Sequence, residues 1–170
     1  LYNWYAVETG KLCPEGWRVP SDNDWTILSD YLGGSSVAGG KLKATGLTYW
    51  NTPNTSATNQ VSFTALGAGN RNTNGAYANT KNINDFWSSN ENISTTAWAR
   101  RLNYNSAAIT RNSYDKRIGF TVRCMKDNYV LIVDTIYTAE VLDLQGIAEE
   151  IAANTKDTCI VDYAIQVDSV

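Results

Sequence analysis

The side chains that most readily do chemistry here are three cysteines, Cys13, Cys124 and Cys159, in a chain of 170 residues without histidine. A histidine-based zinc site is therefore excluded, no CxxC pair occurs, and a cysteine-only site would lack its fourth ligand. Two interpretations of the thiols stay open. Either all three are reduced and buried, or Cys13 and Cys124 form a disulfide and Cys159 is left unpaired. We expect no metal site and no cofactor.

General acid–base catalysis has few candidate residues in this sequence. Histidine, the usual general base near neutral pH, is absent. The carboxylates show no paired arrangement, and Cys13 and Cys124 lie in strand-like motifs that favour a structural role. A GAGNRN stretch lacks the third glycine and the following helix of a phosphate-binding loop. We therefore expect that the protein is not an enzyme.

An alternating segment at positions 95–120 is the clearest candidate for a binding surface. Successive residues of a strand point to opposite faces, so a two-residue period separates two sets of side chains. One set has the composition of a scaffold, and the other is a mixture of small, polar and basic residues. The pattern predicts an antiparallel hairpin with its turn near Asn105–Ala107. An ordinary hairpin with a polar outer face remains the alternative. The scaffold set is Trp98, Arg100, Leu102, Tyr104, Ala107, Ile109 and Arg111.

Helix and strand signals flank this hairpin. Ser21 and Asp24 resemble a capping box and begin a helix that we expect to end near Leu32, before two glycines. A shorter helix is expected over 37–43. The runs LYNWYAV, VSFTALGAG and GFTVRCMK read as strands, and the first and last should be neighbours. These signals predict an α+β fold with a twisted antiparallel sheet and two helices.

Charge divides the chain in two. Residues 1–126 hold 13 basic and 8 acidic side chains, whereas residues 127–170 hold 1 basic and 9 acidic. We expect the acidic extension to form a β-α-β unit that packs on the body or on a second chain, which leaves oligomer formation open. No run reaches the ~18–20 apolar residues of a membrane span, so we expect no membrane insertion. The strand-like beginning suggests a piece of a longer protein.

Several motifs together resemble a known family. CPEGWRVPS at 13–21, GGKLKATG, FTALGAGNRN, FWSSNE and GFTVRC at 119–124 are similar to the Fibrobacter succinogenes major paralogous domain, which occurs in many Bacteroidetes surface proteins. The resemblance covers residues 1–126 and leaves 127–170 as an extension. It implies a C-type-lectin-like fold related to formylglycine-generating-enzyme domains. It also implies a place at the bacterial cell surface or outside the cell, or alternatively on a phage particle.

A narrower resemblance concerns the last fifty residues of the body, which are similar to the variable region of proteins diversified by retroelements. In that system template adenines are mutated, and asparagine codons become codons for the residue types found here at the mixed positions. A solvated strand face tolerates such changes, because surface substitutions usually alter stability by less than about 0.5 kcal/mol. We expect one contiguous, exposed ligand-binding patch formed by Thr95, Thr96, Ala99, Arg101, Ser106, Ala108, Thr110, Ser113, Tyr114, Asp115, Arg117 and Ile118.

The resemblance favours a receptor or adhesin-type module that binds a protein or glycan on another cell or particle. Tyr114, Arg101 and Arg117 are the candidate anchors, and we expect changes at Arg101 or Tyr114 to alter binding but hardly stability. A structural or glycan-binding domain without diversification is the alternative, and an oxidoreductase is a weaker one. Calcium-dependent sugar binding lacks the fold's usual triplets, although WSSNEN at 87–92 offers oxygen ligands. Nucleic acid is disfavoured because the basic patch is thin.

Overall fold

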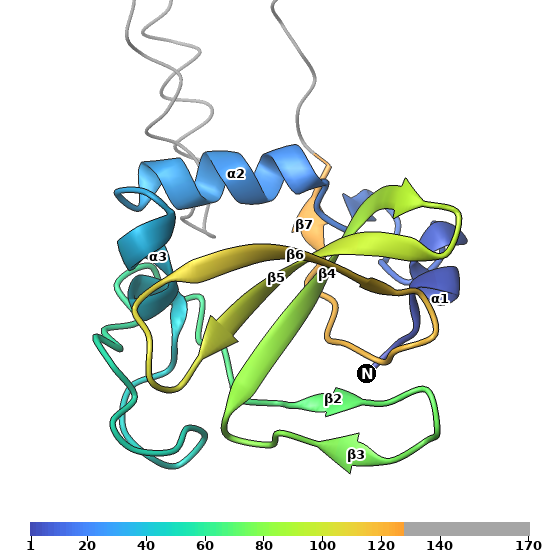
Figure 1. Ribbon diagram of the computed structural model, residues 1–170. Coiled ribbons are helices and arrows are strands. Elements are labelled where there is room, and N and C mark those ends of the chain that lie inside the picture. Colours follow the sequence, from blue (N-terminus) through green and yellow to red (C-terminus); the bar gives the residue numbers. More distant parts are fainter. Residues whose placement is uncertain (128–170) are drawn as a thin grey trace, which may run out of the picture. The chain divides into compact units, whose positions relative to one another are not determined.

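The computed structural model describes residues 1–127, and the structural statements below refer to that part of the chain (Figure 1). The order of elements is mixed, with the helices first and the main sheet after them, so the predicted α+β class is confirmed. The helices are α1 (Trp4–Glu8), α2 (Asp22–Tyr31) and α3 (Ser35–Leu42). The strands are β1 (Trp17–Arg18), β2 (Asn70–Arg71), β3 (Tyr77–Ala78), β4 (Ile83–Ile93), β5 (Thr96–Asn103), β6 (Ile109–Asp115) and β7 (Met125–Lys126).

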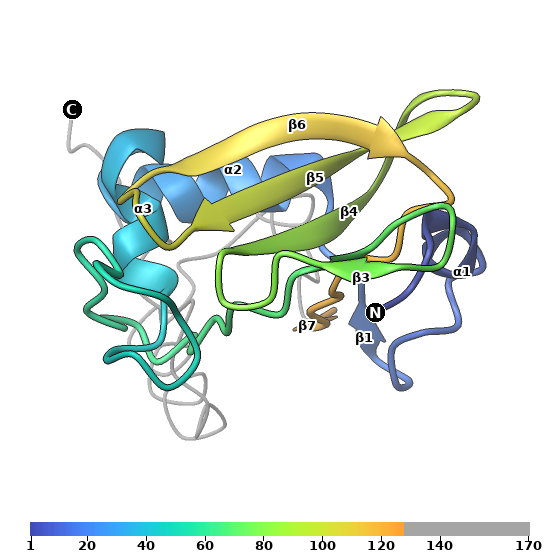
Figure 2. The same cartoon turned by 60° about the horizontal axis from the view of Figure 1, so that its bottom comes forward.

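The main sheet has three strands in the order β4-β5-β6, all antiparallel. Its hairpin pairs Thr96 with Asp115 at one end and Leu102 with Ile109 at the other, without a bulge. The turn therefore falls within the loop between β5 and β6, as the alternation predicts. Two short antiparallel pairs, β1-β7 and β2-β3, complete the sheets of the described residues. Figures 1 and 2 show α2 and α3 on one side of the main sheet.

Helix α2 begins and ends where its sequence signals place it. The Ser21 hydroxyl accepts a hydrogen bond from the Asp24 N–H at 3.1 Å, and the Asp24 carboxylate accepts one from the Ser21 N–H at 2.7 Å. This reciprocal pair satisfies two of the N–H groups that a helix start leaves without partners. Leu32 caps the other end, and two glycines with positive φ follow it. The predicted helix at 37–43 is α3, which begins two residues earlier and ends one residue earlier than predicted.

Two apolar cores cover opposite sides of the main sheet. The larger core lies under α2 and α3 and includes Leu102 and Ile109, which are 0% and 3% exposed. The smaller core gathers α1, Trp87 and Phe120 against the other side of β5. On β5 the smaller core therefore buries Ala97 and Ala99, and the larger core buries Leu102 on the opposite side. The members of the smaller core are Trp4, Val7, Val19, Trp87, Ala97, Ala99 and Phe120, with Tyr114 and Ile118 packed against them.

The first residues do not form the strand that the sequence suggests. Asn3 instead caps α1, where its side chain accepts a hydrogen bond from the Ala6 N–H at 3.1 Å, and Trp4 and Val7 point into the smaller core. The two ends of the body nevertheless meet. Tyr2 and Phe120 exchange backbone hydrogen bonds of 2.8 and 2.9 Å. The expected neighbourhood of these segments is confirmed, although it is a single bridge.

Two other expected strands are wrong as continuous strands. In VSFTALGAG, Ser62 and Thr64 adopt positive φ, which strand geometry excludes. In GFTVRCMK the chain changes partner at nearly every residue, since Gly119 bridges Arg71 and Phe120 bridges Tyr2. Regular pairing begins only at β7, which pairs with β1.

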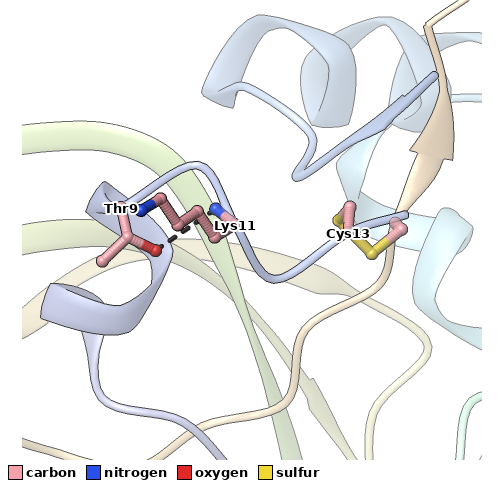
Figure 3. Close-up of a disulfide and its surroundings, with 4 residues drawn as sticks. Thr9, Lys11 and Cys13 are labelled. Carbon is pink, nitrogen blue, oxygen red and sulfur yellow. Dashed lines mark hydrogen bonds between the residues drawn. A yellow bond between two sulfur atoms is a disulfide. The ribbon is translucent and has the colours of Figure 1, made fainter. Parts of the chain in front are cut away.

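A disulfide joins Cys13 and Cys124, with an S–S distance of 2.08 Å and a Cα–Cα distance of 5.7 Å (Figure 3). Cys13 precedes β1 and Cys124 precedes β7, so the bridge lies directly beside the β1-β7 pair. The backbone on the Cys13 side is further held by Thr9, whose hydroxyl accepts a hydrogen bond from the Lys11 N–H at 3.2 Å. Cys159 and the predicted β-α-β extension lie outside the described residues.

Candidate functional site

The main sheet presents its uncovered surface on the side away from α2 and α3. There the smaller core covers the part of β5 near Ala97 and Ala99, and the neighbouring part remains open (Figure 2). The register places Arg101 beside Thr110 and Ala99 beside Asn112. Directly paired residues of antiparallel strands share a face. We call Arg101, Asn103, Thr110, Asn112 and Tyr114 the open face, because they share this side of the hairpin and none of them is fully buried.

Arg101 is fixed on the open face by a buried carboxylate. Its Nε and Nη2 donate to the two carboxylate oxygens of Asp85 at 2.9 and 3.0 Å. The Asp85 side chain is 0% exposed, whereas that of Arg101 is 29% exposed. Burial raises the pKa of Asp85, and the bonds from Arg101 oppose that change. A bidentate pair of this kind holds the guanidinium in one orientation, with one edge turned to solvent.

Tyr114 forms the second fixed part of the open face. Its ring packs edge-to-face on Phe120, with centroids 5.0 Å apart, and the Arg101 guanidinium lies 5.0 Å from the ring centroid. Burial raises the pKa of the Tyr114 hydroxyl to about 12, so the phenol stays neutral and remains a hydrogen-bond donor at physiological pH. Tyr and Arg held rigidly at a surface are the residue types that dominate protein interfaces.

The loop between β5 and β6 is held by a buried lysine. The Lys43 side chain lies in the interior and donates to the Asn103 and Ser106 carbonyl oxygens at 2.9 Å each. Gly39 of α3 approaches this loop so closely that an added Cβ would lie 2.2 Å from the Ala108 carbonyl oxygen. Gly40 donates its N–H to the Ala107 carbonyl at 2.8 Å. The backbone that carries Ser106 and Ala108 is therefore positioned by α3.

Titration of Lys43 should change stability in a defined pH window. Burial lowers the pKa of Lys43 to about 8, from 10.5 in the unfolded chain. Between these values the unfolded chain binds the proton and the folded chain does not, so stability rises with pH. We expect wild type to gain roughly 2–3 kcal/mol relative to Lys43→Met from pH 7.5 to pH 10. Urea unfolding of both proteins measures it, and a pH-independent difference would contradict the assignment.

The predicted site residues occupy three places rather than one patch. Arg101, Thr110 and Tyr114 lie on the open face, with Ala99 beneath. Ser106 and Ala108 lie in the loop beside α3. The remaining ones lie towards the far end of the hairpin, where the Lys116 N–H donates to the Thr95 carbonyl and Asp115 pairs with Arg117. This last group is Thr95, Thr96, Ser113, Asp115, Arg117 and Ile118.

Four of the expected positions, Ala99, Ser113, Thr96 and Asp115, need correction. Ala99 is 0% exposed within the smaller core, because α1 and Trp87 cover that side of β5, so it contacts no ligand. Ser113 pairs with Trp98, and Thr96 pairs with Asp115. By alternation these side chains belong to the side of the sheet that faces α2, opposite Tyr114. The open face that remains is smaller than the predicted patch and includes Asn103 and Asn112, which are not members of that patch.

On the side facing α2, ion pairs link the main sheet to the helix. The Asp22 carboxylate forms two ion pairs, one with the Arg100 Nη1 at 2.7 Å and one with the Arg111 Nε at 2.8 Å. The Arg111 guanidinium lies 3.3 Å from the Trp98 ring centroid. Local spacing does not predict the two ion pairs, since Asp22 lies far from Arg100 and Arg111 in the chain. A shallow polar hollow of about 380 Å³ opens beside them, lined by Ser21, Asp22, Asn23, Asn90, Glu91 and Trp98.

Side-chain oxygens of Ser88, Asn90 and Glu91 in WSSNEN already have partners within the protein. The Asn90 side-chain oxygen accepts from the Asp22 N–H at 2.7 Å, and Glu91 forms an ion pair with Lys116. Ser88 lies buried and donates to the Trp98 carbonyl at 3.0 Å. Residues 1–127 hold no cluster of three His, Cys, Asp or Glu side chains suited to a metal ion. Over the same range, no helix has the length and hydrophobicity that crossing a bilayer requires.

Comparison with known families places the body of the chain. Residues 1–126 match the model of the Fibrobacter succinogenes major domain. The chain belongs to this family. No curated protein and no solved structure matches it. The Fibrobacter succinogenes major domain thus spans the disulfide, both cores and the whole hairpin, and the open face is part of the domain rather than of an appended segment.

Proposed function

We propose that this domain is a ligand-binding module of the receptor or adhesin type, with a C-type-lectin-like scaffold that displays the open face. The observation that carries the proposal is the position of Arg101 and Tyr114. Both are held by buried partners, Asp85 and Phe120, on the side of the sheet that faces away from α2 and α3. Recognition surfaces gain affinity from side chains that need no ordering upon binding.

We further propose that the open face and the neighbouring loop are diversified by a retroelement. Support comes from the separation of roles within one hairpin. Leu102 and Ile109 belong to the larger core, whereas Thr110 and Ser106 do not. Neighbouring DNA tests the idea. A reverse transcriptase gene and an asparagine-rich near-copy of positions 86–124 are expected, and a locus with neither would contradict it.

The ligand is proposed to be a protein or glycan on another cell or particle, reached from the bacterial surface, from outside the cell or from a phage particle. The proposal includes no enzymatic activity, and the state of three carboxylates supports this. Asp22, Asp24 and Asp85 are each engaged by arginine at 3.1 Å or less. The disulfide likewise leaves neither Cys13 nor Cys124 as a free thiol.

Thr110 offers the cleanest test of binding, because its side chain is exposed and lies beside Arg101 in the register. We expect Thr110→Arg to keep the melting temperature within about 2 °C, since exposed substitutions change stability little. Binding on arrays of bacterial surface proteins and of glycans should fall at least tenfold or move to other spots. Thr48→Arg, at an exposed threonine in the loop after α3, is the matched control. Equal binding by all three proteins would refute the assignment.

A further inference from the structure

The outer edge of β6 is a second surface with unused bonding capacity. In the order β4-β5-β6 this strand pairs with β5 alone, and it runs along the free edge of the sheet in Figure 2. It is seven residues long, contains no proline, and its register with β5 has no bulge. Short length, proline and bulges are features by which proteins protect exposed edges, and β6 has none of these, although it does carry the charges of Arg111 and Asp115.

The direction of the β6 backbone groups follows from the hydrogen bonds on the other side of the sheet. The Asp85 carbonyl and the Trp87 N–H bond to Thr121, so these residues face away from β5. Backbone groups alternate along antiparallel strands. Thr110, Asn112 and Tyr114 therefore bond to β5, and Arg111, Ser113 and Asp115 point outward. Within residues 1–127, the outward N–H groups of these three residues have no hydrogen-bond partner.

We propose that this edge pairs with β6 of a second copy of the chain, antiparallel, about a two-fold axis at Ser113. In that register Ser113 lies opposite Ser113 of the partner subunit, and Arg111 lies opposite Asp115 of the partner subunit. Outward-pointing residues then face one another, as hydrogen-bonded antiparallel pairs require. The same operation repeats the Arg111 and Asp115 pairing on the other side of the axis, so opposite charges meet twice. Each contact would extend an ion pair already present in one copy, Arg111 with Asp22 and Asp115 with Arg117.

The two charge pairs favour this register over other registers, and a second copy of the chain over another extended peptide. Shifting the axis to Asn112 would also keep the outward residues opposed, but it would place Arg111 opposite serine and diagonal to its own copy. An arbitrary extended peptide would share the backbone bonds without these two charge pairs. The other side of the joined sheet would pair Asn112 with Tyr114 of the partner subunit. Asn112 and Tyr114 are both partly exposed, so their side chains are accessible to such a partner.

The pairing would join the two main sheets into one of six strands. Directly opposed residues share a face, so both open faces would lie on the same side. Two equal sites on one surface raise the avidity for a repeated ligand without any new contact. Because only strand edges meet, the area buried is small and the association is weak and concentration-dependent.

Sedimentation velocity of the full chain over micromolar to millimolar concentrations tests the proposal. Wild type is expected to show a monomer–dimer equilibrium. Ser113→Lys sets two ammonium groups against each other at the axis and should weaken dimerisation at least tenfold, with the melting temperature unchanged because Ser113 is exposed. Ser94→Lys, at an exposed serine in the β4–β5 turn, should dimerise like wild type. A monomeric wild type would overturn the proposal.

Amide hydrogen exchange locates the contact. The amides of Arg111, Ser113 and Asp115 should become protected as concentration rises, whereas those of Thr110, Asn112 and Tyr114 should not change, since they already bond to β5. A dimer that persists in Ser113→Lys, or whose added protection falls elsewhere in the chain, would overturn the proposal. Protection of the edge amides in a monomeric sample by an added protein would instead identify a peptide-binding edge and exclude the two-fold pairing.

Discussion

A Cys13→Ser, Cys124→Ser variant is expected to melt about 12–25 °C below the wild type. The bridge joins residues that are 111 positions apart. In the chain-entropy model a loop of this length contributes roughly 4–5 kcal/mol, and each kcal/mol shifts the melting temperature of a body this size by about 3–5 °C. The loss should be felt first at β1-β7, which consists of two residue pairs beside the bridge.

Thermal unfolding followed by circular dichroism measures this effect. Cys159→Ser is the control, because it removes a thiol without touching the bridge, and its melting temperature should match the wild type. Reducing agent should lower the melting temperature of wild type and of Cys159→Ser, and it should leave the double variant unchanged. A double variant as stable as wild type would show that β1-β7 is held by other contacts.

Replacing Arg101 by methionine is expected to destabilise the protein by about 3–5 kcal/mol at pH 7. The change removes the partner of Asp85 and leaves a carboxylate that is 0% exposed without its two hydrogen bonds. Asp85→Asn should cost less, because the Arg101 side chain is 29% exposed and reaches water. The double variant should be more stable than Arg101→Met alone, since it contains no unpaired buried charge.

The pH dependence separates this explanation from lost packing. Burial raises the folded-state pKa of Asp85 above the ordinary 3.8, and without Arg101 nothing opposes that rise. The folded variant then binds a proton that the unfolded chain does not, so its stability falls as pH rises through the folded pKa. The deficit relative to wild type should shrink between pH 7 and pH 5. Urea unfolding at both values measures it, and an unchanged deficit would indicate packing alone.

This expectation reverses the one that the sequence suggested for Arg101. As a mixed-position residue on a strand, it was expected to change binding and leave stability almost unaffected. The structure shows that its partner Asp85 lies on β4, directly opposite in the register and fully buried. If retroelement variation reaches this position, most substitutions should lower stability. The proposed role in binding and the role in folding would then be combined in one side chain.

The sequence by itself determined the features that depend on neighbouring residues. The reciprocal bonds of Ser21 and Asp24 are local, so the start of α2 was readable from four residues. The two-residue period of β5 and β6 identified the hairpin, and it correctly placed Leu102 and Ile109 in the larger core. The α+β class followed from the same signals.

Tertiary structure alone decided which surface is open. A period of two states that Ala99 and Trp98 point to opposite sides, but it cannot state what lies on either side. Helix α1, about 90 residues earlier in the chain, covers Ala99, while the partners of Arg100, Arg111 and Arg101 come from α2 and β4. Such long-range contacts leave no trace in local spacing. The same reason explains why LYNWYAV was predicted as a strand. Its apolar residues are compatible with both the strand period and the helix period, and only the packing of Trp4 and Val7 in the smaller core favours the helix.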